Sequence, residues 1–196
     1  MGLTINPIKL EGSWRGGYAL DLATLSSTPI GHGPTGRMMF ETKRPEIGEH
    51  LFQLKYRDNK NAAGPIIDTA AIFLQPSVKC FDILVPIPPS KNRQLQPVII
   101  LAQGISQKIA LPYEPCITTT RATGQHKDIA DLEERKQEMD GLYTVDAART
   151  TNKRILLFDD VYDTGTTLNA ITDLLLNKGK AASVDVLTIT KTRSRS

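Results

Sequence analysis

The chain has 196 residues, with 24 lysines and arginines against 21 aspartates and glutamates, so its formal net charge is +3. Hydrophobic residues make up 40% of the chain and no apolar run approaches the ~18 residues of a membrane span, which is typical of a soluble globular protein and excludes an integral membrane protein. The two distant cysteines, Cys80 and Cys116, exclude a disulfide framework or a zinc ribbon, and the N-terminus has no targeting pattern, so we expect a cytoplasmic protein.

The first 45 residues differ in composition from the rest of the chain. They are rich in Gly, Pro, Ser and Thr, with short strand-like pieces at 18–22 and 37–40. From residue 46 the spacing of Ile47, Leu51 and Leu54 predicts a helix that ends near residues 55–57, and a second helix follows over 66–74 after Pro65. We therefore expect residues 1–45 to form a hood-like extension and 46–196 to form the core.

Predicted strands and helices alternate in the rest of the chain. The strands are expected at 81–85, 116–120, 142–145, 154–158 and 183–190. Helices are expected to begin at Pro97 and at Leu168, with Gly179 closing the second one. This alternation predicts an α/β fold with a parallel sheet, and ligands bind such sheets beyond the carboxyl ends of the strands.

The most informative segment follows the predicted strand 154–158. Asp159 and Asp160 stand where this apolar run ends, and two carboxylates can accept hydrogen bonds from two vicinal hydroxyls. Residues 163–167 are a small, hydroxyl-rich turn around Gly165 that opens a helix, and such a helix start binds phosphate. A diol binder beside a phosphate site indicates a ribose 5-phosphate. The alternative is that the acids merely end the strand and Asp163 caps the helix.

Residues 155–167 resemble the motif that binds 5-phosphoribosyl 1-pyrophosphate (PRPP) in type I phosphoribosyltransferases. Residues 46–193 resemble the ComF-type (competence-associated) branch of that superfamily, through Leu54-Lys55-Tyr56, 82–88 and 187–193. The chain lacks the N-terminal zinc module of that branch, and residues 93–97 replace its usual RGFNQ stretch. The resemblance implies a parallel-sheet, Rossmann-like type I phosphoribosyltransferase fold with an N-terminal hood or helical extension.

The same resemblance implies an activity, a cofactor and roles for individual residues. The chain would be a pentosyltransferase that binds PRPP with Mg²⁺, transfers phosphoribose to a small-molecule acceptor such as a nucleobase, and releases pyrophosphate. Asp159 and Asp160 would hold the ribose hydroxyls and contact the metal, mostly through substrate or water. The 5-phosphate site would comprise Asp163, Thr164, Gly165, Thr166 and Thr167. The pyrophosphate loop would comprise Pro88, Ser90 and Lys91, and a flexible loop at about 121–141 would contribute Arg121, Gln125 and Arg135.

Several points stay open at this stage. Asp163 is a candidate base near the acceptor or only a helix cap. The chain could instead be a non-catalytic sensor of PRPP or nucleotides, or a DNA-uptake accessory protein, although a net charge of +3 gives little support for a nucleic-acid partner. We expect PRPP and a small acceptor as ligands, no membrane, and a homodimer, which is the commonest soluble assembly.

Overall fold

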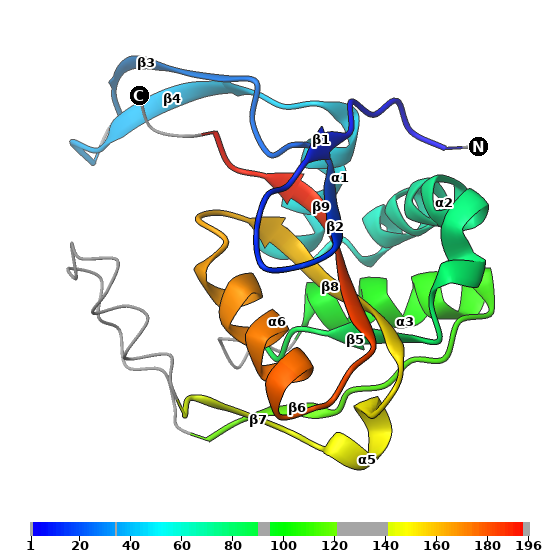
Figure 1. Cartoon of the computed structure of the whole chain (residues 1–196). Coiled ribbons are helices and arrows are strands. Elements are labelled where there is room, and N and C mark those ends of the chain that lie inside the picture. The colour runs from blue at the N-terminus through cyan, green and yellow to red at the C-terminus, as the bar shows by residue number, and fades with distance from the viewer. Residues whose placement is uncertain (1, 34, 90–94, 121–140, 194–196) are drawn as a thin grey trace.

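A computed structural model describes residues 2–33, 35–89, 95–120 and 141–193. Its centre is a five-stranded sheet in the order β1-β2-β9-β8-β5 (Figure 1). The strands are β1 (Ile8–Lys9), β2 (Gly16–Leu22), β9 (Ser183–Lys191), β8 (Arg154–Tyr162) and β5 (Ile83–Pro86). The last four run parallel to their neighbours and only β1 is antiparallel. The predicted α/β class with a mostly parallel sheet is therefore confirmed.

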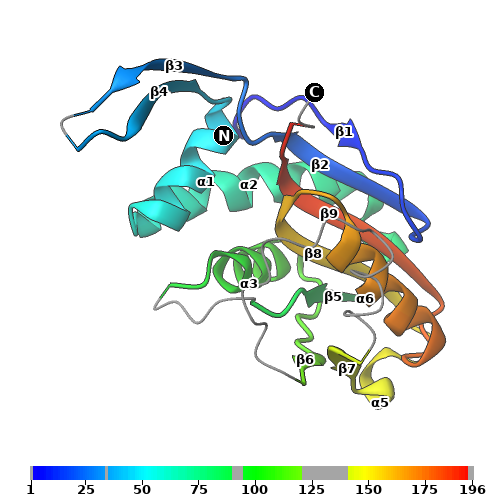
Figure 2. The same ribbon diagram turned by 90° about the vertical axis from the view of Figure 1, so that its left-hand side faces the viewer.

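Helices cover both faces of this sheet (Figure 2). On one face lie α1 (Glu46–Tyr56), α2 (Ala63–Leu74) and α3 (Pro97–Ile109), and on the other lies α6 (Thr166–Asn177). Leu156 and Phe158 of β8 pack toward the three helices, whereas Ile155 and Leu157 pack toward α6. Burial on both faces explains the unbroken apolar run in β8, since neither face of a covered parallel sheet meets water.

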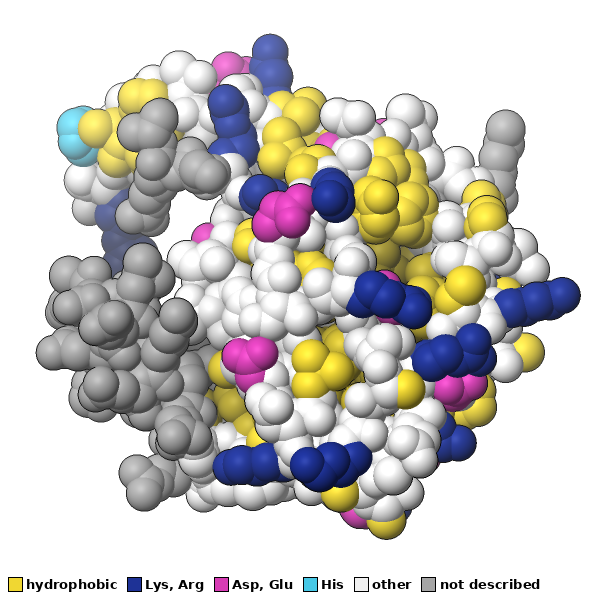
Figure 3. All heavy atoms as spheres, in the orientation of Figure 1, with side chains coloured by type: hydrophobic (Ala, Val, Ile, Leu, Met, Phe, Trp, Pro, Cys, Tyr) yellow, Lys and Arg dark blue, Asp and Glu magenta, His cyan; other side chains and the backbone are white. Residues whose placement is uncertain are grey.

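Two pairs of strands lie outside the central sheet. The predicted strand at 116–120 is β6 (Ile117–Thr119), which pairs antiparallel with β7 (Tyr143–Val145). β6 buries only Ile117, so it lacks the two apolar faces that a central parallel strand needs. The other pair is the hairpin of β3 (Ser26–His32) and β4 (Met38–Lys43). Its exposed apolar side chains lie at the upper left of Figure 3, and include Ile30, Met39 and Phe40.

Residues 1–45 thus contribute to two different parts of the fold. β2 is an inner strand of the central sheet, between β1 and β9, whereas the β3–β4 hairpin projects past α1 (Figure 2). The division into an extension at 1–45 and a core at 46–196 stays a prediction. Among the described residues, no helix is long and apolar enough to cross a membrane.

The ends of several elements differ from the sequence-based expectation. β8 continues through the acid pair to Tyr162 rather than stopping at Phe158, because Asp159, Val161 and Tyr162 all pair with β9. At the end of α6 the left-handed residue is Lys180, with a φ of 54°, and not Gly179. A Cβ on Gly179 would lie 2.7 Å from the carbonyl oxygen of Leu175. A glycine at this position therefore lets the backbone pass close to Leu175, and it does not serve as the left-handed residue.

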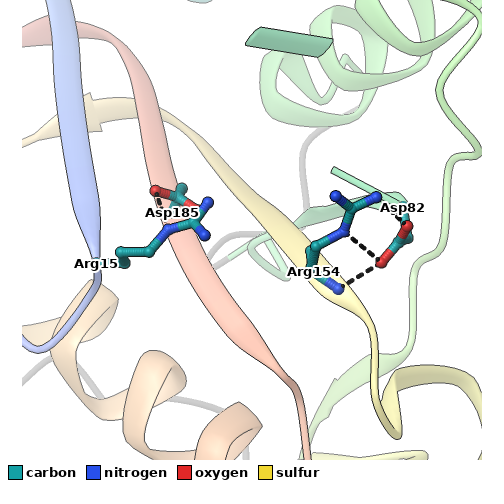
Figure 4. Close-up of polar contacts among 4 residues, drawn as sticks. All are labelled: Arg15, Asp82, Arg154 and Asp185. Carbon is teal, nitrogen blue, oxygen red and sulfur yellow. Dashed lines mark hydrogen bonds and ion pairs between the residues drawn. The ribbon is translucent and has the colours of Figure 1, made fainter. Parts of the chain in front are cut away.

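Two ion pairs join neighbouring strands at the amino ends of the sheet (Figure 4). Arg154 of β8 donates two side-chain hydrogen bonds to Asp82, the residue before β5, at 2.7 and 3.1 Å. Its backbone N–H donates a third to Asp82 at 2.8 Å. Arg15 donates to Asp185 of β9 at 2.7 and 3.3 Å. These pairs hold the strands in register at the edge opposite the acid pair.

Candidate functional site

A cleft of about 300 Å³ opens at the carboxyl ends of β5 and β8. This volume is at the lower end of the range for small-molecule sites, which is roughly 300–1,000 Å³. Segments far apart in the sequence form its walls: α1, the loop after β5, the start of α3, β7, β8 and the start of α6. The structure therefore brings the predicted acid pair, both ends of the predicted phosphate turn (Asp163 and Thr167) and part of the predicted pyrophosphate loop to one cleft, whereas Thr164, Gly165 and Thr166 do not line it.

The acid pair forms the floor of this cleft. Successive strand side chains point to opposite faces, so Asp159 and Asp160 leave β8 on different sides, yet both line the cleft near the carboxyl end of β8. Oδ1 of Asp159 accepts the backbone N–H of Asp160 at 2.7 Å. Both acids therefore line the same cleft.

A lysine from α1 contacts the second acid. Nζ of Lys55 lies 2.9 Å from Oδ2 of Asp160, and the two side chains are only 16% and 14% exposed. Lys55 also lines the cleft. The cleft therefore presents a hydrogen-bond donor beside the two acceptor groups.

The two carboxylates have different electrostatic surroundings. Burial and the charge of the neighbouring Asp160 raise the pKa of Asp159 to about 7, and the hydrogen bond from the Asp160 backbone N–H and the charge of Lys55 oppose this effect. Tyr143 of β7 lies across the cleft, and burial together with the charge of Asp159 raises the pKa of its hydroxyl. Lys55 pairs directly with Asp160, whereas no described lysine or arginine forms an ion pair with Asp159.

The predicted phosphate turn begins directly after β8. Gly165 has a φ of 79° and immediately precedes α6. The hydroxyls of Thr164 and Thr166 lie 2.9 Å apart, and the carbonyl of Gly165 accepts both the backbone and the side-chain N–H of Asn169 at 2.9 Å. The turn thus combines hydroxyls with the N-terminus of a twelve-residue helix, a combination that suits an anion.

Asp163 does not cap α6. The cap residue is Gly165, without a side-chain hydrogen bond, and Oδ1 of Asp163 instead accepts the Thr192 hydroxyl at 2.6 Å. Asp163 is exposed and lines the cleft together with Thr167. Of the two roles open at the sequence level, the helix cap is excluded by this geometry and the base stays a prediction.

The other predicted residues are only partly described. Pro88 lies in the cleft wall next to Ile87, whose backbone N–H donates to the Phe158 carbonyl at 2.9 Å. Ser90 and Lys91 of the predicted pyrophosphate loop lie outside the described residues. So do Arg121, Gln125 and Arg135 of the predicted flexible loop.

Sequence reasoning gave no functional role to Lys55 or Tyr143, which the fold brings into the cleft from other elements. For Lys55 a signal existed. It lies eight residues after Ile47 and so falls on the apolar stripe that Leu51 and Leu54 also occupy, where a lysine is unusual. For Tyr143 no pattern in the chain gave such a signal.

The carboxylates can contribute to a magnesium site but do not form a complete one. Among the described residues, no group of three or more His, Cys, Asp or Glu side chains could hold a metal ion. Mg²⁺ binds oxygen ligands and usually takes one or two carboxylates together with substrate phosphates and water. Asp159 and Asp160 fit that limited role, with a substrate supplying the remaining oxygens.

Sequence comparison identifies one family. The model of the phosphoribosyl transferase domain matches residues 99–196, which is half of the chain and includes the acid pair and the phosphate turn. Among curated protein sequences none matches.

Solved structures share the fold at low sequence identity. Glutamine PRPP amidotransferase from B. subtilis, solved with ADP and GMP, is 19% identical, with a TM-score of 0.52 over 80% of this chain and 34% of its own. Adenine phosphoribosyl transferase from Trypanosoma brucei, solved with AMP, pyrophosphate and ribose-5-phosphate, is 13% identical, with the same TM-score over 95% of this chain and 75% of its own. An allosteric regulatory enzyme of purine biosynthesis is 17% identical, with a TM-score of 0.52 over 87% of this chain and 44% of its own. The present chain thus spans less than half of the first and third of these proteins.

Proposed function

Because the chain belongs to the phosphoribosyl transferase domain family, we propose that it binds PRPP with Mg²⁺ and transfers the phosphoribosyl group to a small acceptor of the nucleobase class, releasing pyrophosphate. The main support for this proposal is that an acid pair and a phosphate-binding turn contribute to the same cleft. Asp159 and Asp160 at the end of β8, and Asp163 and Thr167 of the following turn, all line it. A ribose 5-phosphate has a diol and a phosphate that match these two features.

The ribose and its phosphate bind to groups of complementary character. Asp159 and Asp160 accept hydrogen bonds from the 2- and 3-hydroxyls, since carboxylates offer only acceptors when ionised. The 5-phosphate lies at the start of α6, where Thr164, Thr166 and Thr167 supply hydroxyls and the helix N-terminus supplies backbone N–H groups.

The pyrophosphate group leaves from the side of the cleft that Pro88 lines. Ser90 and Lys91 follow Pro88 in the sequence and supply a hydroxyl donor and a cation for the diphosphate. The family resemblance assigns Arg121, Gln125 and Arg135 to the same group. Asp159 and Asp160 would hold Mg²⁺ directly or through water, and the ion would supply positive charge that offsets the charge of the diphosphate.

The transfer itself needs no covalent nucleophile from the protein. The bond between the anomeric carbon and the pyrophosphate oxygen breaks, and the diphosphate takes the bonding electron pair. A nitrogen lone pair of the acceptor forms the new bond to that carbon, and Asp163 takes the proton that the acceptor loses. The protein contributes chiefly by holding the reactants in position and stabilising the charge that develops on the sugar.

Calorimetric titration with PRPP and Mg²⁺ tests the binding step. We expect saturable heat from the wild-type chain and none from the variant Asp159→Asn/Asp160→Asn. The matched control is Asp58→Asn/Asp173→Asn, which removes the same two charges at exposed positions and should bind like the wild type. The proposal fails if the wild type gives no heat, or if the acid-pair variant binds as well as the control.

Pyrophosphate release with a panel of nucleobases tests the transfer step. Release with any acceptor supports the enzyme and excludes a protein that only senses PRPP. Binding of PRPP without release for every acceptor favours the sensor. Assignment to the ComF-type branch rests on the sequence resemblance alone, and the cytoplasmic location, the homodimer and the acceptor remain proposals of the same kind.

A further inference from the structure

Lys55 is a charged residue of the cleft to which the proposed function assigns no role. It lies on α1, outside the matched segment 99–196, yet its ammonium lies 2.9 Å from the carboxylate of Asp160. The other described lysine ion pairs are on the surface: the Lys108 side chain is 56% exposed beside Asp68, and the Lys9 side chain is 67% exposed beside Glu11. Lys55, at 16%, has lost most of its contact with water.

A desolvated ion pair in a ligand cleft has unused hydrogen-bonding capacity. An ammonium has three N–H donors and no acceptor, and a carboxylate has only acceptors. One N–H of Lys55 is directed to Asp160 at this distance, and both residues line the cleft. The cleft wall therefore offers an N–H donor and a carboxylate acceptor side by side.

A sugar hydroxyl matches this arrangement, since it carries one donor and two acceptor lone pairs. We propose that Lys55 and Asp160 bind one hydroxyl of the ribose diol together, with the hydroxyl donating to Asp160 and accepting from Lys55. This inference rests on the proposed function. It makes Lys55 a residue that selects ribose over a deoxyribose, because a missing hydroxyl would leave two desolvated charged groups without that partner.

The test measures dissociation constants by calorimetry for ribose 5-phosphate, 2-deoxyribose 5-phosphate and 3-deoxyribose 5-phosphate. For the wild type we expect that loss of one of the two hydroxyls weakens binding by about 10- to 100-fold, the usual value of a hydrogen bond to a charged group. In Lys55→Met this penalty should become several-fold smaller for that same hydroxyl, because only its bond to Asp160 remains, while the penalty for the other hydroxyl stays as in the wild type. Lys55→Arg should keep part of the discrimination because it keeps a donor.

Two further variants control for stability and charge. Lys108→Met removes one surface lysine from an ion pair without touching the cleft and should retain the wild-type discrimination. Lys55→Met/Asp160→Leu removes both polar members of the pair, so that no buried charge is left alone if Lys55→Met proves unstable. It should bind ribose 5-phosphate and the relevant deoxy sugar about equally.

The outcomes separate the two proposals. If the wild type binds none of the three sugar phosphates, the proposed function fails. If the wild type discriminates and Lys55→Met discriminates equally, only the role of Lys55 is wrong. If Lys55→Met weakens all three ligands by one factor, Lys55 acts through general charge attraction, and its assignment to a hydroxyl is overturned.

Discussion

The hydroxyl of Tyr162 occupies the space that a side chain on Gly165 would need. A Cβ built on Gly165 would lie 2.6 Å from that oxygen and 3.0 Å from two carbons of the ring. The backbone of Gly165 has a φ of 79°, a conformation that side chains disfavour. The shape of the proposed phosphate turn thus depends both on a glycine and on the ring at the end of β8.

Replacing this glycine should damage the turn for both reasons. We expect Gly165→Ala to lower the free energy of unfolding by at least about 1–2 kcal/mol, the usual cost of a left-handed alanine. Binding of ribose 5-phosphate should weaken in parallel because the backbone N–H groups of the turn move. Urea unfolding and calorimetry measure the two effects.

Gly64 provides the matched control for this substitution. It lies in α2, and a Cβ there would have open space around it. Gly64→Ala should raise the free energy of unfolding by about 0.4–1 kcal/mol and leave ribose 5-phosphate binding unchanged. Equal stability of the two alanine variants would contradict the importance of the left-handed turn.

The single tryptophan of the chain reports on the same turn. The rings of Trp14 and Tyr162 pack edge to face with their centroids 6.4 Å apart. The residue next to Trp14, Ser13, donates its backbone N–H to the side chain of Asn169 in α6 at 2.7 Å. Binding of phosphate at the turn should therefore change the fluorescence of Trp14.

We expect a saturable change in emission with ribose 5-phosphate, with the same dissociation constant as calorimetry gives. Trp14→Phe should remove this signal while calorimetric binding persists. If emission stays constant while calorimetry shows saturation, the ligand does not act on the 163–167 turn.

The part of the site that is contiguous in the sequence could be predicted, and the part that tertiary contacts assemble could not. Asp159, Asp160 and the turn around Gly165 follow one another along the chain, so their types and spacing carried the inference. Lys55 lies 105 positions before Asp160, and only the fold brings their charged groups together. Its position on an apolar helix stripe was a signal of burial but named no partner.

The prediction of the fold likewise succeeded for local features and missed those that depend on long-range contacts. The apolar run from Ile155 to Phe158 predicted a strand buried on both faces, because a short continuous apolar run is typical of a parallel strand covered on both sides. Its continuation through Asp159 and Asp160 was missed, since aspartate is rare in strands and pairing with β9 outweighs that local preference. Likewise the place of β2 beside β9 follows from long-range packing.

The ion pair between Asp82 and Arg154 should stabilise the fold without affecting the cleft. The hydrogen bonds that Arg154 donates lower the pKa of Asp82 from 3.8 to about 2. A carboxyl with a lowered pKa in the folded state stabilises that state above the unfolded-state pKa, and this contribution is lost as the pH falls toward the folded-state pKa. Asp82→Asn should therefore lower the unfolding free energy at pH 7, and the difference from the wild type should shrink between about pH 4 and pH 2.

Urea unfolding at a series of pH values measures this difference. Calorimetry with ribose 5-phosphate is the second readout, and we expect its dissociation constant to be unchanged because the pair lies at the amino ends of the strands (Figure 4). A constant difference in stability from pH 7 to pH 2 would show that Asp82 acts through packing rather than through its charge.

The contribution of Asp159 to folding stability should change with pH in the opposite direction to that of Asp82. Burial and the charge of Asp160 raise its pKa from 3.8 to about 7, so between these values the folded chain holds a proton that the unfolded chain has released. The unfolding free energy attributable to Asp159 therefore falls as the pH rises from about 4 to about 7 and stays constant above that. Asp159→Asn, which cannot ionise, should be more stable than the wild type at pH 8, by up to about 4 kcal/mol at about 1.4 kcal/mol per pKa unit, and equally stable near pH 4.

The variants Asp160→Asn and Asp173→Asn distinguish this effect from a general loss of negative charge. Asp160→Asn leaves the Lys55 ammonium without its carboxylate in a largely buried position, so it should lower stability at pH 8. Asp173 is exposed on α6, and its replacement should change little. If Asp159→Asn gains stability at pH 8 yet no longer binds ribose 5-phosphate, the protein keeps a destabilising carboxylate for the sake of its ligand, as functional sites commonly do. If all three variants respond alike to pH, the raised pKa of Asp159 is not what sets the pH dependence of folding.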